Sequence, residues 1–182
     1  MSNTHINDLR DTLTHARLCY EGWWLFECAH PKRQEIVSAY NQHLDFFHAV
    51  HPALYVTFVI KLASVFGTRN DEISLKSISG VDQIAGFSEL WDRGRRFHKY
   101  RSKIVAHRDI NIATNTFIPG SGCRTNASLK QLLDDTCQLF DDAAERLNVG
   151  GVHPCTLEED FLNLVSVLSQ DQTHCNPPHE VL

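Results

Sequence analysis

An arginine and a histidine near the middle of the chain are suited to phosphodiester chemistry. Arg101 and His107 lie in the stretch YRSKIVAHRD, residues 100–109. An imidazole titrates near neutrality and can accept or donate a proton, whereas a guanidinium holds a phosphate through its planar fork. Such a pair can cleave RNA without a metal, because the histidine moves protons at the ribose 2′-hydroxyl or the leaving 5′-oxygen while the arginine stabilises the phosphorane. DNA lacks the 2′-hydroxyl and would be inert.

Positive charge is concentrated around this pair. No acidic residue interrupts the run from position 93 to position 108, although the whole chain has a net charge of -5. A concentration of this kind is typical of a surface that binds a nucleic-acid backbone. A solvated helix face, or pairing with acidic groups of a neighbouring helix, explains the charge equally well. The residues expected to bind RNA are Arg93, Arg95, Arg96, Lys99 and Arg108.

Helical geometry restricts how Arg101 and His107 can act together. They are six residues apart, which is about 600° of rotation, so they do not share one face of an ideal helix. Lys103 and His107, four apart, do share a face. The pair can meet at one phosphate if the helix ends before His107 or if a second protomer supplies one partner. An arginine followed closely by a histidine is also not specific, because pairs five residues apart occur at Arg10/His15 and Arg93/His98. A helix C-terminal histidine favoured by the macrodipole is the competing interpretation of His107.

The elements that must position these residues are helices. Apolar residues recur three or four positions apart, which predicts helices over about residues 7–29, 32–47, 52–67, 87–106, 127–148 and 157–168 and a short turn near 75–78. Pro52 suits a first helical turn, Asn126 an N-cap, and Thr156 with Glu159 a capping box. Residues 110–122 can form one extended segment. No β-α-β alternation is present, so the sequence predicts an all-α antiparallel bundle of five or six helices, with one domain over residues 1–170 and a flexible tail over 171–182.

Composition predicts a cytosolic protein. The chain has 182 residues, 42% of them hydrophobic, which suits one domain with a substantial core. The N-terminal residues lack a signal-peptide pattern, and the apolar stretch 53–66 is short and contains Lys61, which favours a buried helix over a membrane span. The six cysteines include no CxxC pair and are expected to be reduced thiols.

Other chemistry finds less support in the sequence. The histidine and cysteine groups at positions 43, 48 and 51 and at positions 153, 155, 174 and 175 lack closed zinc-finger spacing, so we expect no metal. No cysteine stands beside a recognisable histidine or asparagine partner, which argues against a thiol nucleophile. A Gly-rich loop followed by Lys-Ser/Thr is absent from the sequence, which disfavours an NTPase, and no cofactor is expected.

The stretch HPALYVTFVIKLASVFGTRNDEISL, residues 51–75, together with YRSKIVAHRD, resembles the HEPN superfamily of helical proteins, and most of all its AbiU-like abortive-infection branch. The resemblance covers about residues 8–147. Its most specific part is the motif of an arginine, four to six residues and a histidine, here Arg101 to His107. The resemblance implies a bundle that dimerises through its motif helices and, in many members, metal-independent RNA cleavage as a toxin or antiphage effector.

Carried over by position, the resemblance implies that Arg101 orients the scissile phosphate and that His107 is the acid/base. Asp109 can hold the second imidazole nitrogen, and Ser102 and Lys103 are supporting residues. Ser102 departs from the family pattern, because active members usually place Asn, Asp or His directly after the arginine, and a serine cannot replace a histidine's proton chemistry. The family also contains non-catalytic modules.

Three interpretations of function therefore stay open. The first is an endoribonuclease acting on single-stranded RNA or tRNA as a homodimer, without a membrane partner and with an antitoxin protein as a candidate partner. The second is an inactive module that binds RNA, a nucleotide or an antitoxin with the same basic surface. The third is a structural dimer in which the basic helix pairs with the acidic helix predicted at residues 127–148.

Overall fold

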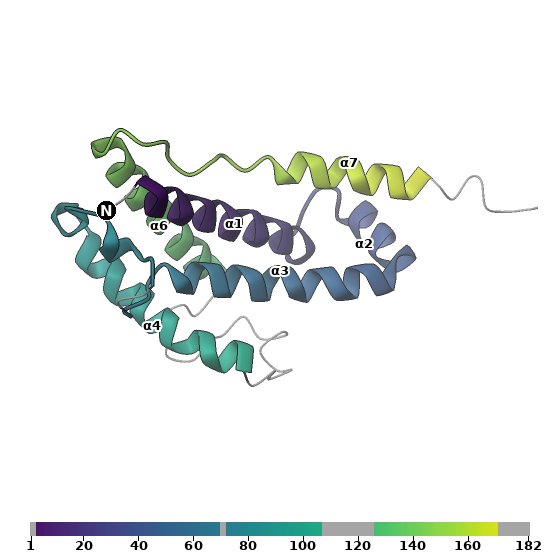
Figure 1. The fold of residues 1–182 in the computed structure, drawn as a ribbon. Coiled ribbons are helices and arrows are strands. Elements are labelled where there is room, and N and C mark those ends of the chain that lie inside the picture. The colour runs from purple at the N-terminus through teal and green to yellow at the C-terminus, as the bar shows by residue number, and fades with distance from the viewer. Residues whose placement is uncertain (1–2, 70–71, 107–125, 171–182) are drawn as a thin grey trace, which may run out of the picture.

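The structure is a computed structural model that describes residues 3–69, 72–106 and 126–170. Every regular element in those ranges is helical, which confirms the predicted all-α class for that part of the chain (Figure 1). The elements are α1 Asn3–Glu27, α2 Arg33–Gln42, α3 Leu44–Ser64, the 3-10 helices η1 Leu75–Ser77 and η2 Val81–Gln83, α4 Phe87–Ala106, α6 Asn126–Arg146 and α7 Leu157–Gln170.

Helix α1 is the central element of the bundle. Helix α1 packs against α3, α6 and α7, and α4 packs against α3 and α6 (Figure 1). The buried residues Leu9, Leu13, Ala16 and Tyr20 of α1 recur at helical spacing and join a large core with residues of α3, α4 and α6. Burial of this stripe therefore orients α1 within the bundle.

A second, smaller core lies where α1 ends. Phe26 packs there with Ile36 and Ala39 of α2, Phe47 of α3 and Val165 of α7. The rings of Phe26 and Phe47 have centroids 5.6 Å apart in an edge-on arrangement. The last helix of the described chain therefore closes this core together with elements from its first third.

The boundary between α2 and α3 differs from the prediction. A helix was expected to continue to Phe47 and the next to start at Pro52, but the break falls at His43, with φ -120° and ψ 47°. Pro52 lies inside α3, in its third turn, where it leaves the carbonyl of His48 without the usual helical donor. Burial of Phe47 in the smaller core explains why the helix extends past the proline toward its N-terminus.

Helix α3 is apolar on all sides. By length and composition α3 could cross a membrane. Only 28% of its most apolar 18-residue stretch is buried inside this fold. Its C-terminal half follows the expectation of a buried helix, since Phe58, Val59, Leu62 and Ala63 are fully buried. The outward side of its N-terminal half stays accessible.

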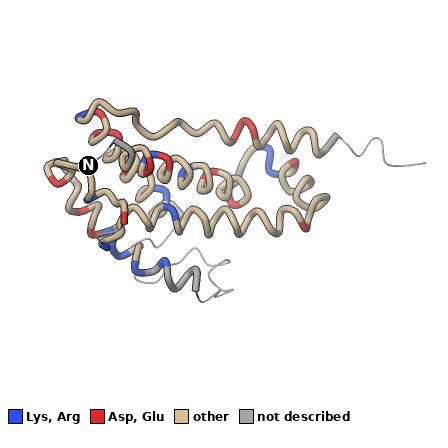
Figure 2. Tube along the Cα trace, in the orientation of Figure 1, with Lys and Arg blue, Asp and Glu red and all other residues tan. Residues whose placement is uncertain are grey.

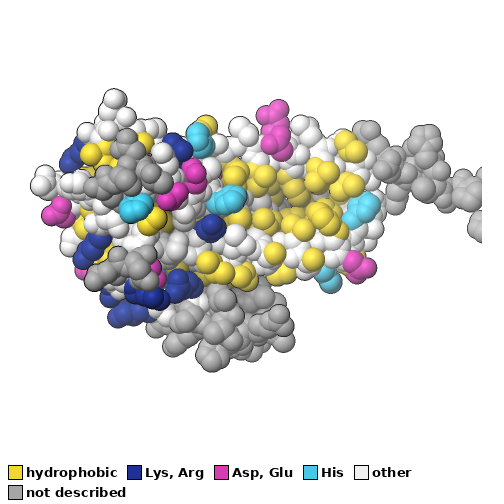
Figure 3. Space-filling model, viewed as in Figure 1, with side chains coloured by type: hydrophobic (Ala, Val, Ile, Leu, Met, Phe, Trp, Pro, Cys, Tyr) yellow, Lys and Arg dark blue, Asp and Glu magenta, His cyan; other side chains and the backbone are white. Residues whose placement is uncertain are grey.

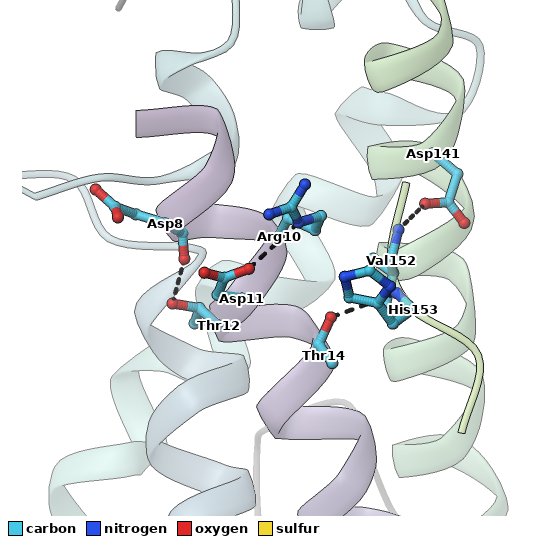
Figure 4. Close-up of polar contacts among 8 residues, drawn as sticks. All are labelled: Asp8, Arg10, Asp11, Thr12, Thr14, Asp141, Val152 and His153. Carbon is cyan, nitrogen blue, oxygen red and sulfur yellow. Dashed lines mark hydrogen bonds and ion pairs between the residues drawn. The ribbon is translucent and has the colours of Figure 1, made fainter. Parts of the chain in front are cut away.

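The connection from α6 to α7 runs alongside α1 (Figure 1) and is fixed by polar contacts (Figure 4). Asn148 adopts a left-handed conformation, φ 54°, and ends α6, with the amide of Val149 donating to the carbonyl of Ala144 at 2.9 Å. The Asp141 carboxylate then accepts from the amide of Val152 at 2.7 Å, and Thr14 of α1 accepts from the amide of His153 at 3.4 Å. These contacts direct the chain back along α1 toward α7.

Candidate nucleic-acid interface on helix α4

Helix α4 carries the basic run, and its bounds agree with the predicted helix. Its apolar residues Phe87, Leu90, Trp91 and Phe97 are buried, and this stripe sets which way every other side chain of the helix faces. Gly94 lies in the same stripe, where the Phe66 ring occupies the place that a side chain would take, with Cδ1 2.1 Å from an ideal Cβ. The helix is thus held close against the end of α3.

Two groups of cations lie on different faces of α4. Basic residues gather along α4 (Figure 2). Arg96 and Lys99 are exposed and lie on the side of the helix opposite the buried stripe, whereas Arg95, four residues after Trp91, is half-buried at the edge of the stripe. Arg101 comes four residues after Phe97, which places it on the face that continues the buried stripe, and its side chain is half-buried. The basic run is therefore not one uniform charged face.

His98 anchors α4 to the end of α3. Its Nδ1 lies 2.8 Å from the carbonyl oxygen of Ala63, and because a carbonyl only accepts, Nδ1 carries the proton in this contact. The carbonyls of a last helical turn lack helical donors, which makes this a suitable acceptor. The contact gives His98 a structural role within the basic run, between Arg96 and Lys99.

Arg93 is engaged by the acidic helix α6. Its guanidinium donates to Oδ2 of Asp135 at 2.7 Å, and both side chains are about one-third exposed, at 28% and 32%. The pair lines a hollow of about 380 Å³ between α4 and α6, with Glu89 and Asp142 on its other walls. Pairing with the acidic helix was one of the alternative explanations for the basic run, and Arg93 makes such a pair.

The remaining motif residues lie at or beyond the end of α4. Ser102 and Lys103 belong to its last turns. His107, Arg108 and Asp109 lie outside the described residues, so the pairing of Arg101 with His107 stays a prediction. The extended segment expected at residues 110–122 and the tail 171–182 also lie outside them.

The structure has a second hollow, which the sequence analysis did not predict. It has a volume of about 260 Å³ and is lined by Phe26, Glu27, Arg33, Ile36, Val37, Tyr40 and His51. The buried Nε2 atom of His51 lies 3.0 Å from Oε1 of Glu27 and pairs with that carboxylate when the ring is protonated. Burial lowers the pKa of His51, and the nearby Glu27 carboxylate opposes that shift.

His51 comes directly before Pro52, which was expected in the first turn of a helix, and both residues lie in the interior of α3. The proline predicted a helix start near position 51, and that prediction was wrong because Pro52 lies in the third turn of α3. The partners Glu27 and Arg33 come from α1 and α2, which no local pattern around residue 51 connects to it.

Burial raises the pKa of Cys137 to about 11, so this thiol is protonated at neutral pH and unsuited to act as a nucleophile. Within residues 3–69, 72–106 and 126–170, no group of three or more His, Cys, Asp or Glu side chains is placed to hold a metal ion.

The chain was compared with models of protein families, with curated proteins and with solved structures, and none of the three comparisons yields a match.

Proposed function

We propose that this chain is a metal-independent endoribonuclease of HEPN type, acting as a cytosolic homodimer in antiphage defence or as the toxin of a toxin–antitoxin pair. Arg101 and His107 would be its catalytic residues, at a cleft between the two protomers. Single-stranded RNA or tRNA would be the substrate. The proposal rests on the motif in the sequence and on the way α4 presents its cations.

The observation that carries the proposal is the position of Arg101. Arg96 and Lys99 lie on the opposite side of α4 from the buried stripe, whereas Arg101 continues that stripe and, like Arg95 at its edge, is half-buried. A guanidinium that is partly withdrawn from water interacts more strongly with a phosphate than a fully solvated one. This division supports separate tasks, in which the outward cations track the RNA backbone and Arg101 holds the phosphate that reacts.

The proposed reaction is an internal transesterification. The ribose 2′-oxygen attacks the adjacent phosphorus and the bond to the 5′-oxygen breaks, which leaves a 2′,3′-cyclic phosphate and a 5′-hydroxyl. His107 would take the proton from the 2′-hydroxyl or give one to the leaving 5′-oxygen, with the other transfer made by its copy or by water. Arg101 would neutralise the extra negative charge on phosphorus, and Ser102, Lys103 and Asp109 would support these two residues.

The test is cleavage of labelled single-stranded RNA and tRNA in EDTA. Wild-type protein is expected to leave 2′,3′-cyclic phosphate ends, and Arg101→Ala and His107→Ala are expected to lose most of the rate. His15→Ala is the matched control, because His15 is exposed on α1 and is preceded five residues earlier by Arg10. Equal inactivity of wild type and His107→Ala on all substrates would refute catalysis.

A second candidate function is a non-catalytic module that binds RNA, a nucleotide or an antitoxin partner. The ion pair between Arg93 and Asp135 favours it, since part of the basic run stabilises the bundle instead of contacting a ligand. Expression in bacteria separates the two. Growth arrest that Arg101→Ala or His107→Ala relieves supports the nuclease, whereas salt-sensitive RNA binding without arrest supports the module.

A further inference from the structure

Lys76 brings a positive charge to α4 from another part of the chain. It belongs to the short helix η1 and is exposed, and its ammonium group lies 4.8 Å from the centroid of the Trp91 ring in a cation–π contact. Trp91 is part of the buried stripe of α4, so the contact places this charge beside the second turn of that helix. No local pattern in the sequence links residue 76 to the basic run, which begins at Arg93.

The backbone on both sides of Lys76 is held by the core. Leu75 is fully buried, and its amide donates to the carbonyl oxygen of Val65, at the end of α3, at 2.9 Å. The amide of Ser74 donates to Oγ of Ser77 at 3.2 Å. A cation on a fixed backbone, with its stem against a ring, loses less conformational freedom when it binds an anion than a solvated lysine does. Lys76 is therefore preorganised to bind an anion.

Trp91, Arg95 and Lys99 form one row along α4, each four residues after the last. Because four residues turn a helix by about 400°, the row drifts by about 40° at each step, from the buried stripe at Trp91 to the outward side at Lys99. Lys76 lies over the first member of the row and so continues its line of charge. Figure 3 shows Lys and Arg side chains gathered over α4 on the visible face. Neither Lys76 nor Arg95 pairs with a carboxylate of the described residues.

Charge decides on which side of α4 an RNA strand can continue past Arg95 toward the start of the helix. The outward side of the first turns carries Glu89 and Asp92, which are both exposed and repel a phosphate. The side toward η1 carries Lys76 over the Trp91 ring. A polyanion that follows the cations of α4 is therefore directed toward η1 and away from the two carboxylates.

We propose that Lys76 is an RNA-binding residue and that the bound strand passes from α4 to η1 over Trp91. Successive phosphates meet Lys99, Arg95 and Lys76 in turn. A helix rises about 1.5 Å per residue, which puts Lys99 about 12 Å beyond Trp91, a length that suits several phosphates spaced about 3.4 Å apart along a stacked strand. The inference rests on the proposed function for the binding of RNA but not for its cleavage.

The first experiment measures how the full chain binds a 2′-O-methyl RNA of about 12 nucleotides over a range of salt concentrations. This RNA lacks the nucleophilic 2′-hydroxyl, so it stays intact and binding is measured apart from cleavage. Lys76→Met removes the charge but keeps a flexible apolar side chain against Trp91. It is expected to reduce the slope of log affinity against log salt by about 0.7, so its effect on affinity is about fivefold larger at 0.1 M than at 1 M salt. Lys76→Arg is expected to keep the wild-type slope.

Lys32→Met is the matched control, because Lys32 is an exposed lysine at the start of α2, which packs against α7 and α3 and not against η1 or α4 (Figure 1). Circular dichroism verifies that each variant stays helical. Binding by the wild type with a slope that Lys76→Met leaves unchanged overturns this inference alone. A loss that Lys76→Arg shares means that Lys76 acts through the packing of Trp91, and it also overturns the inference. A wild type without salt-sensitive RNA binding overturns the inference together with the proposed function.

Site-directed cross-linking tests the path of the strand independently of affinity. The background has Ser in place of every cysteine except the buried Cys137, and it is used once its RNA affinity matches that of the wild type. A photoreactive azide attached to Lys76→Cys is expected to cross-link to the 2′-O-methyl RNA, whereas the same group on Glu89→Cys or Lys32→Cys is expected not to. Cross-linking from Glu89→Cys and not from Lys76→Cys would place the strand on the outward side of α4 and would reject the path over Trp91.

Discussion

The ring of Phe66 lies directly against the backbone of Gly94, where α4 meets the end of α3. A Cβ on residue 94 would stand 2.1 Å from Cδ1 and Cε1 of that ring, and Phe66 is fully buried, so the ring has no solvent-filled space to enter. This contact brings the basic helix close to the core, and it depends on the absence of a side chain at one position.

Gly94→Ala is therefore expected to destabilise the fold. Alanine is intrinsically better than glycine in a helix by about 1 kcal/mol, but overpacking against a buried ring costs about 1–3 kcal/mol and decides the sign. Urea unfolding followed by circular dichroism measures the difference. Gly150→Ala is the control, because the nearest atom to its added Cβ lies 3.7 Å away, and an equal loss in both variants would contradict the packing argument.

Arg93 is expected to contribute to stability through Asp135. The pair is partly exposed, so a double-mutant cycle with Arg93→Ala and Asp135→Ala should give a coupling of about 0.2–1 kcal/mol. Arg93→Ala should then change RNA affinity less than Arg96→Ala does, because Arg96 is exposed on the outward side of α4. If Arg93→Ala lowers RNA affinity more than Arg96→Ala and shows no coupling to Asp135, the Arg93 guanidinium contacts RNA instead of the acidic helix.

The outward cations and Arg101 are expected to differ in their salt dependence. Arg96→Ala should reduce the slope of log affinity against log salt for single-stranded RNA by about 0.7, the value for one phosphate contact. Arg101→Ala should mainly lower the cleavage rate at saturating RNA. Filter binding at several salt concentrations and single-turnover cleavage measure the two effects separately, and identical profiles for both variants would mean that the faces of α4 are not functionally distinct.

Acidification is expected to destabilise the protein through His51. Its pKa in the fold is lowered from 6.5 because burial disfavours the charged ring, so the unfolded chain binds more protons. The contribution of His51 to stability is therefore present above about pH 6.5 and is lost as pH falls through the lower folded value. Urea unfolding at pH 7.5 and 5.5 should show a smaller difference for His51→Gln than for wild type. The exposed His15→Gln serves as the control, and an unchanged difference in His51→Gln would remove His51 as the cause.

Much of α4 could be predicted from the sequence because the pattern that defines it is local. Four large apolar residues at helical spacing mark its buried side, and the same spacing places Arg101 on that side and Arg96 away from it. The short turn near residue 75 was also predicted, and η1 Leu75–Ser77 confirms it. Predicting these features requires only the periodicity of a helix.

The features that were not predicted depend on contacts between distant elements. The break at His43 was missed because Pro52 is a strong local signal, whereas the burial of Phe47 against Phe26 is a tertiary one. Predicting that Arg93 pairs with Asp135 requires the register between α4 and α6, which no local pattern gives. The same holds for His51, whose neighbours come from two other helices.

The position of α7 in the smaller core has a consequence for the order in which the protein can fold during synthesis. Val165 completes a cluster whose other members, among them Phe26 and Ile36, are made more than a hundred residues earlier. Until α7 has been synthesised, α2 has no covering partner from it, and its apolar side is open to water or to chaperones. A chain cut before residue 157 would therefore keep that side of α2 uncovered.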